Sequence, residues 1–243
     1  MRAFIGAVTP PLRSAGVTPS AARARGLGVL TVGQSPRADV TPTLRSILGP
    51  NVEVREAGAL DGLDTAAIED LAPRPGETPL ETRLGGGDAV VVSKDRIVPH
   101  LVARARELAS TCDTVLLLCS GTFQGLADAC PSIVEPGPIL HAVVAGLGRR
   151  RRIGLVGPAA DLERAGDDWA ADAPGFQVAA ASPYAPRTQL LEAGMQLVGT
   201  GADLVVLDDM AFTEEQRRDL AEATGLPVLC ATTLTARVLC EIV

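Results

Sequence analysis

A cysteine at the end of an apolar stretch is the first candidate for chemistry in this sequence. The stretch reads Asp-Thr-Val-Leu-Leu-Leu-Cys, ends at Cys119, and continues with Ser120, Gly121 and Thr122 before the chain turns helical again. Such a run predicts a buried strand, and open α/β sheets bind ligands at the carboxyl ends of their parallel strands. Cys119 is therefore expected in a loop at a ligand-binding edge, although a free thiol is often only a small buried residue.

A second stretch repeats this pattern in the other half of the chain. Residues 203–207 read Asp-Leu-Val-Val-Leu and are followed by Asp208 and Asp209. Each half is thus expected to present a reactive side chain, Cys119 or Asp209, from an equivalent strand end. The alternative for Asp209 is an N-cap of the next helix, but Thr213 is better placed for that role.

The first strand of the chain also ends in polar residues. The strand expected at 28–33 leads into Gln34, Ser35, Pro36 and Arg37, and a helix is expected over 38–48. A hydroxyl and a guanidinium at the junction of a strand and a helix N-terminus are suited to hold an anion such as a carboxylate. Alternatively, Ser35 only caps the helix.

Strands and helices alternate along the chain, which predicts a parallel α/β fold. Aromatic residues make up 2% of the chain, so the core must consist of aliphatic side chains, as in sheets covered on both faces. Three glycines at 85–87 separate the segments 79–84 and 88–93, which predicts a hairpin. The glycines are not expected to bind a nucleotide, because the sequence pattern of a phosphate-binding loop is missing. Helices are also expected at 65–71, 96–110, 138–147, 160–170, 187–199, 213–223 and 233–242.

Two domains are expected. The first spans 27–112 and the second 113–232, with 113–150 as a segment that the two domains could share and the helix 233–243 packing back on the first domain. Residues 1–26 contain arginines and prolines without an acid, and are expected to form a disordered extension or an arm for homo-oligomer contacts.

Composition excludes several classes of function. The formal net charge of −7 and the pI near 4.9 argue against a nucleic-acid partner. The chain has no apolar run of membrane-spanning length and no secretory signal, so a cytoplasmic location is expected. The five cysteines include no C-x-x-C pair, and the only histidines are His100 and His141, which argues against a zinc site. Free thiols in a reducing compartment are expected.

Several motifs resemble those of the AroM family. They are Gly-Gln-Ser-Pro-Arg at 33–37, Glu-Ala-Gly-Ala-Leu at 56–60, Thr-Arg-Leu at 82–84, Leu-Cys-Ser-Gly at 118–121, Ser-Pro-Tyr at 182–184 and Gly-Ala-Asp-Leu-Val-Val-Leu-Asp at 201–208. AroM proteins resemble the aspartate/glutamate racemase superfamily. The resemblance implies two similar parallel-sheet α/β domains with pseudo-twofold symmetry around a central cleft, no cofactor, and a thiol from each domain on opposite faces of the substrate.

The resemblance also implies a site and a reaction. Cys119 and Asp209 would be catalytic, and a small carboxylate substrate would be bound by Gln34, Ser35, Arg37, Arg83, Ser120, Gly121, Thr122 and Tyr184. Helix N-terminal amides around Cys119 are expected to lower the pKa of its thiol. The expected enzyme is a racemase or isomerase that moves a proton α to the carboxylate.

One position departs from the AroM pattern. Asp209 stands where these sequences usually have a second cysteine, so a two-thiol reaction is in doubt. Cys230 could substitute for that thiol but is more simply a small buried residue. The alternatives are a decarboxylase-type lyase that uses Cys119 alone, and a non-catalytic or regulatory protein that only binds a small carboxylate.

Overall fold

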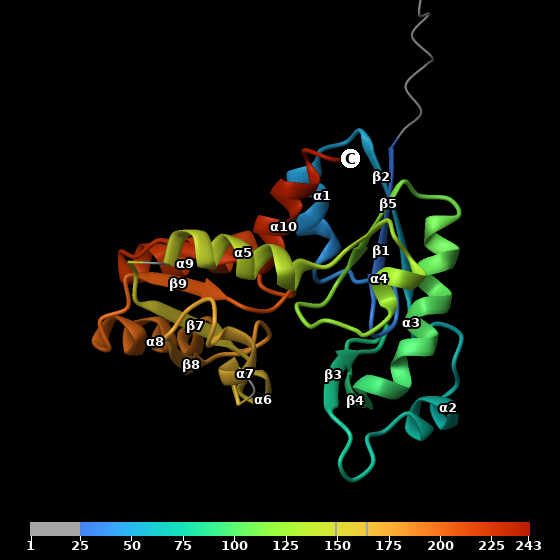
Figure 1. Cartoon of the computed structure of the whole chain (residues 1–243), viewed down its shortest axis with the longest axis horizontal. Helices are drawn as coiled ribbons and strands as arrows, with labels where there is room; N and C mark the ends of the chain where they lie inside the picture. Colours follow the sequence, from blue (N-terminus) through green and yellow to red (C-terminus); the bar gives the residue numbers. More distant parts are fainter. Residues whose placement is uncertain (1–24, 149, 164) are drawn as a thin grey trace, which may run out of the picture.

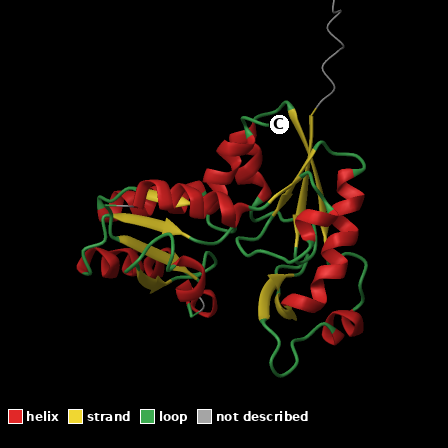
Figure 2. Ribbon diagram, in the orientation of Figure 1, coloured by secondary structure: helices red, strands yellow, loops and turns green. Residues whose placement is uncertain are grey.

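The structure, a computed structural model, describes residues 25–148, 150–163 and 165–243. Within these ranges the chain forms two four-stranded parallel sheets and a two-stranded antiparallel hairpin (Figures 1 and 2). The N-terminal extension expected at 1–26 lies outside the described residues up to residue 24, whereas Arg25 and Gly26 already belong to the first strand. No helix in the described ranges has both the length and the apolar character needed to cross a membrane.

The two sheets have the same strand order. The first contains β2 (Val52–Gly58), β1 (Arg25–Thr31), β5 (Thr114–Leu117) and β6 (Ile133–Val134). The second contains β8 (Gln177–Ala180), β7 (Ile153–Gly157), β9 (Leu204–Leu207) and β10 (Val228–Cys230). The predicted pair of similar parallel-sheet α/β domains is therefore confirmed.

The correspondence between the sheets extends to single residues. Leu30 of β1 pairs with Leu117 of β5, and Val156 of β7 pairs with Leu207 of β9. One residue beyond each pair, the backbone N–H of Leu118 donates to Leu30 O at 2.7 Å and that of Asp208 donates to Val156 O at 2.9 Å. The next residues along the chain are Cys119 and Asp209, which therefore occupy equivalent positions.

An aspartate lies just before each of the equivalent strands β5 and β9 and accepts a hydrogen bond from the neighbouring strand's N-terminal end. Asp113 Oδ2 accepts from the Gly26 N–H at 3.3 Å, and Asp203 Oδ1 accepts from the Arg152 N–H at 3.2 Å. Each aspartate thus ties the strand that leads to the site to the N-terminal end of the central strand beside it.

A shared core joins the two sheets. On β5 and β9, Leu116 and Val206 point into this shared core, whereas their neighbours point into a separate core on the outer side of each sheet. Four helices contribute buried residues to the shared core: α1 (Thr41–Leu48), α5 (Pro136–Gly148), α7 (Ala165–Trp169) and α10 (Ala231–Leu239). Burial on both faces explains why β9 and the last three residues of β5 are apolar.

The sheets decide to which half the middle of the chain belongs. Residues 113–134, expected to open the second domain or to be shared, supply β5 and β6 to the first sheet, because β5 pairs with β1. The C-terminal α10 follows β10 of the second sheet but packs against α1 of the first half, and the two helices lie side by side in Figure 1. The chain thus crosses between the halves twice.

A hairpin is inserted between the first sheet and its long helix. β3 (Pro79–Arg83) and β4 (Ala89–Ser93) pair around the glycine turn, as predicted, and α3 (Lys94–Ala109) follows directly. Gly33 is needed at the contact with this hairpin, because a Cβ there would lie 2.0 Å from the carbonyl oxygen of Arg83. The close approach brings the hairpin against the end of β1.

The remaining helices cover the outer faces and the loops: α2 (Thr65–Asp70), α4 (Leu126–Ala129), α6 (Ala159–Leu162), α7 (Ala165–Trp169), α8 (Arg187–Gly199) and α9 (Glu214–Thr224). The single helix expected over 160–170 is wrong, since α6 and α7 are separate and short. Gly166 and Asp168 are poor helix formers, and Trp169 is held by a contact outside the helix, described below. Thr213 caps α9 as predicted, with its side chain accepting from Gln216 N.

Candidate active site

Cys119 leaves the first sheet where β5 ends and enters a loop. The expected helix N-terminus around it is wrong, because α4 begins only at Leu126 and is preceded by Gly125 in the left-handed conformation. Burial raises the pKa of the Cys119 thiol to about 12, and the charges of Asp209 and Asp161 add to this effect, whereas the Gly121 N–H and Lys94 oppose it. The thiol is therefore neutral in the free protein at physiological pH, which makes it a proton donor.

Asp209 leaves the second sheet at the corresponding point. Its Oδ1 accepts from the Ala211 N–H at 2.6 Å, which fixes the carboxyl group in the turn after β9. Burial raises the pKa of Asp209 to about 7, with further contributions from Asp161 and Asp208 that the Ala211 N–H and Arg37 only partly offset. A carboxyl group with a pKa near neutrality can act as either an acid or a base.

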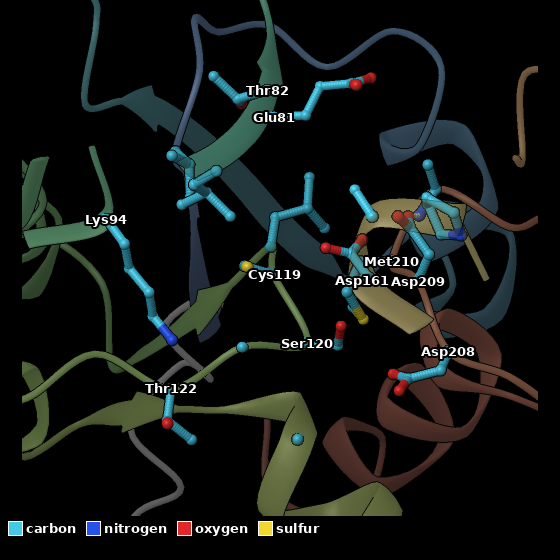
Figure 3. Close-up of a pocket in the computed structure, with 18 of the residues that line it drawn as sticks. Glu81, Thr82, Lys94, Cys119, Ser120, Thr122, Asp161, Asp208, Asp209 and Met210 are labelled. Carbon is cyan, nitrogen blue, oxygen red and sulfur yellow. Dashed lines mark hydrogen bonds between the residues drawn. The ribbon is translucent and has the colours of Figure 1, made fainter. Parts of the chain in front are cut away.

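One cavity brings these two side chains together. It has a volume of about 500 Å³ and is lined from both halves of the chain. Figure 3 shows Cys119 reaching it from the β5 side, while Asp208 and Asp209 reach it from the β9 side. The expected site residues that line it are Arg37, Arg83, Cys119, Ser120, Gly121, Thr122, Tyr184 and Asp209.

Gln34 and Ser35 are not among the lining residues, although both were expected to bind substrate. Ser35 donates from Oγ to Asp61 Oδ2 at 2.6 Å and from its backbone N–H to Asp61 Oδ1 at 2.8 Å. Gln34 Oε1 accepts from the Gly85 N–H at 2.9 Å, and the Gln34 N–H donates to Arg83 O at 2.9 Å. Both residues therefore hold the strand-end loop and the hairpin in place.

Arg37 lines the cavity, but its charge is already matched within the protein. Its guanidinium donates to both carboxylate oxygens of Asp39, at 2.9 and 2.8 Å, and to Thr31 Oγ1 at 3.1 Å. Burial lowers the pKa of Arg37, but Asp39 and the other neighbouring groups raise it overall. Asp39 stands only two residues after Arg37, but its pairing with the guanidinium was not predicted from the sequence.

Tyr184 links this ion pair to the second half. Its hydroxyl accepts from Arg37 Nη2 at 2.8 Å and donates to Asp39 Oδ2 at 2.7 Å. The guanidinium carbon of Arg83 lies 3.7 Å from the centroid of the Tyr184 ring, and Arg83 Nη1 donates to Gly87 O. Arg83 Nε is buried without a hydrogen-bond partner in the described part of the chain. Tyr184 thus connects two arginines of the first half to the second half.

Trp169, His141 and Asp208 meet in the wall of the cavity. Trp169 Nε1 donates to Asp208 Oδ2 at 2.8 Å, and the indole stacks on His141 with ring centroids 3.9 Å apart. His141 Nδ1 in turn lies 2.8 Å from Asp172 Oδ2. Burial raises the pKa of Asp208, although Trp169, His141 and Ser120 each favour its charged form. The apolar residues around His141 in the sequence conceal its polar contacts.

Lys94 and Asp161 also line the cavity and were also missed. Cys230 does not line it: the thiol is buried and points to Phe212 O at 3.5 Å. Among the described residues, no group of three or more His, Cys, Asp or Glu is arranged to hold a metal ion.

Three solved structures illustrate the fold of the chain. A mutant of arylmalonate decarboxylase in the liganded form has 13% identity and a TM-score of 0.58, covering 90% of this chain and 93% of that one. Glutamate racemase from Francisella tularensis in complex with D-glutamate has 11% identity and a TM-score of 0.57, covering 90% and 81%. Allantoin racemase from Klebsiella pneumoniae has 14% identity and a TM-score of 0.52, covering 89% and 86%. At these identities the likeness shows the racemase-like fold.

The sequence itself identifies the family. No curated protein gives a significant match. The family model described as AroM protein matches residues 27–243, which includes all the strands and helices described above apart from the first two residues of β1. The chain belongs to the AroM family.

Proposed function

We propose that this protein is a cofactor-independent enzyme of the racemase or isomerase type that transfers a proton α to the carboxylate of a small substrate. Cys119 and Asp209 act from opposite faces of the substrate. The observation that carries the proposal is their equivalence: each follows by two residues the last paired residue of corresponding strands, and both line one cavity. A substrate between two equivalent strand ends can be reached by both groups.

The acid–base properties of the two groups suggest different roles. Asp209, with a pKa near 7, is available as the base that removes the α-proton, and the neutral Cys119 thiol is available as the acid. In one turnover the substrate gives one proton to Asp209 and takes one from Cys119, so its composition is unchanged. The resulting thiolate is stabilised by the Gly121 N–H and the positive charge of Lys94.

Decarboxylation is the second candidate, and the neutral thiol favours it. When a C–CO₂ bond breaks, the electron pair stays on the α-carbon and CO₂ leaves. The Cys119 thiol then protonates this carbon, and no base is required. A structural neighbour is an arylmalonate decarboxylase, and others are racemases, so the fold is compatible with either reaction.

Proton exchange tests the proposal. The protein is incubated in deuterated water with amino acids, hydantoins, malonates and maleate, and incorporation of deuterium at the α-carbon is followed by NMR. Cys119→Ser should abolish turnover in both reactions, whereas Asp209→Asn should abolish exchange but spare decarboxylation. Cys240→Ser is the matched control, because this thiol is exposed and does not line the cavity.

The outcomes separate the candidates. Exchange at the full rate in Cys119→Ser would contradict the racemase or isomerase candidate, and release of CO₂ at the full rate in this variant would contradict the decarboxylase. Thermal stabilisation by one of these compounds without exchange or release of CO₂ would support the non-catalytic carboxylate-binding alternative.

A further inference from the structure

Lys94 places a positive charge beside the loop that carries Cys119. It is the first residue of α3 and follows β4 directly, so the hairpin determines its position. In Figure 3 the Lys94 side chain extends toward the Cys119–Thr122 loop. Its Nζ lies 3.9 Å from the position of a Cβ built on Gly121, and the Cys119 Sγ lies 3.6 Å from the same point. The ammonium group and the thiol therefore border the same space.

That space is open because residue 121 has no side chain. A Cβ on Gly121 would meet both groups at ordinary contact distances, and Gly121 is not among the glycines with positive φ. Neither the backbone conformation nor a steric clash thus requires glycine at this position. The missing side chain instead leaves room between the thiol and the ammonium group.

The charge of Lys94 has no carboxylate partner within the described ranges, since none of their ion pairs includes it. Its contact is with the Phe123 ring, whose centroid lies 5.6 Å from Nζ. Arg37, by contrast, is matched by Asp39. Asp208 and Asp209 are in the cavity wall on the β9 side and repel an anion when they are ionised. Arg83 also lines the cavity, but its guanidinium lies over the Tyr184 ring. The positive charge beside the Cys119 loop is that of Lys94, which attracts a substrate carboxylate to this side.

We propose that Lys94 Nζ and the Gly121 backbone border an anion subsite, which holds the substrate carboxylate next to Cys119. The identity of the anion as substrate rests on the proposed function, but the subsite itself does not depend on turnover. A carboxylate held there keeps the attached α-carbon close to Sγ and has its charge offset by the ammonium group. Lys94 is thus a substrate-binding residue that selects for an acid group on the thiol side.

Two alkylating reagents of nearly equal size test the subsite. Iodoacetate carries a carboxylate and iodoacetamide does not. With either one, the thiolate forms an S–C bond, iodide leaves, and the thiol proton goes to water. The rate of modification at Cys119 is measured at pH 8 by peptide mass spectrometry, which separates it from the other cysteines. Lys94→Met should slow iodoacetate by about tenfold, because a charge-assisted contact is lost. It should slow iodoacetamide by only about threefold or less, through the acidity of the thiol.

Two variants serve as controls. Lys94→Arg should retain the ratio of the iodoacetate rate to the iodoacetamide rate found in the unchanged protein, since it keeps the charge. Arg96→Gln removes a charge from the same helical turn, but its side chain pairs with Asp70 outside the cavity, so both rates should stay unchanged. Equal slowing of both reagents by Lys94→Met, or no effect on either, would overturn the subsite. If Lys94→Met slows iodoacetate selectively but no compound undergoes exchange or releases CO₂, only the proposed function fails.

Discussion

Asp209 and Cys119 stand at equivalent positions but differ in acidity. The pKa of Asp209 is raised to about 7 and that of Cys119 to about 12, in both cases first by burial. The upward shift brings the pKa of the carboxyl group into the range where it exchanges protons at neutral pH. The same shift moves the pKa of the thiol further from neutrality. Of the two groups, Asp209 is therefore the one whose protonation changes near neutral pH.

Asp209→Asn should stabilise the protein above neutral pH. The pKa of Asp209 is about 7 in the folded state against an ordinary value of 3.8. Between these values the folded state binds more protons than the unfolded state, so the free energy of unfolding falls as the pH rises and levels off above 7. Asparagine stays neutral and can still accept from Ala211. We expect the variant to gain about 1–3 kcal/mol at pH 8.

Urea denaturation at two pH values checks this expectation. At pH 4 or below, where Asp209 is protonated in the folded state, the two proteins should differ little. Asp88→Asn changes an exposed carboxylate in the hairpin turn and should show no such dependence. A gain that is equal at pH 4 and pH 8 would mean that the charge of Asp209 is not the cause.

At this scale the sequence located the residues at strand ends but not their neighbours. Cys119 and Asp209 could be predicted because each lies just after a short, mainly apolar run that is preceded by an aspartate. Lys94 could not, since its place beside Gly121 depends on how the hairpin packs against the first sheet. The same holds for His141 and Trp169, which are 28 positions apart and meet only through tertiary packing.

Among the elements, α8 and α9 form the cover of the second sheet, and a glycine decides how closely they approach. Gly194 is buried in α8, and a Cβ there would lie 2.3 Å from Leu220 Cδ1 and 2.9 Å from Thr224 Cγ2, both on α9. Gly199, at the end of the same helix, has nothing within 4 Å of its Cβ position. The two glycines therefore lie in the same helix, but only Gly194 is packed closely against α9.

Alanine at these two positions should have opposite effects. Gly194→Ala forces α9 away and should lower the free energy of unfolding by about 1–3 kcal/mol. Gly199→Ala has free space and a better helix propensity, so it should leave stability unchanged or raise it by up to about 1 kcal/mol. Chemical denaturation of both variants decides the matter, and a stabilising Gly194→Ala would show that the helices can separate without cost.

The types of most elements could be predicted, because apolar residues recur with the period of a strand or a helix and glycines mark the turns. The hairpin at 79–93 and the alternating strands appear where expected. The boundaries were less predictable: α10 begins directly after β10, and the helix near 160–170 is split. In the second case the hydrogen bond from Trp169 to Asp208, which joins segments 39 positions apart, is absent from any local pattern.

The two halves are joined by the shared core and by a polar contact at the cavity. The repeated sheets were visible in the sequence as a repeated order of strands and helices, but their connection was not. Residues 113–134 belong to the first half because β5 pairs with β1. Local sequence patterns do not show with which sheet a strand pairs. The contact of Tyr184 with Arg37 and Asp39 spans about 145 positions and was equally hidden.

Tyr184→Phe should loosen the connection between the halves while retaining the ring under Arg83. The lost hydroxyl contributes two hydrogen bonds to charged groups, but the side chain is 42% exposed, so the expected loss in the free energy of unfolding is about 1 kcal/mol. Asp39→Asn should cost more, because Arg37 is 8% exposed and loses its ion pair. In the double variant the two losses should not add, with a coupling of about 0.5–1 kcal/mol. Urea unfolding of the four proteins measures this coupling. Strict additivity would mean that the hydroxyl of Tyr184 does not hold Asp39.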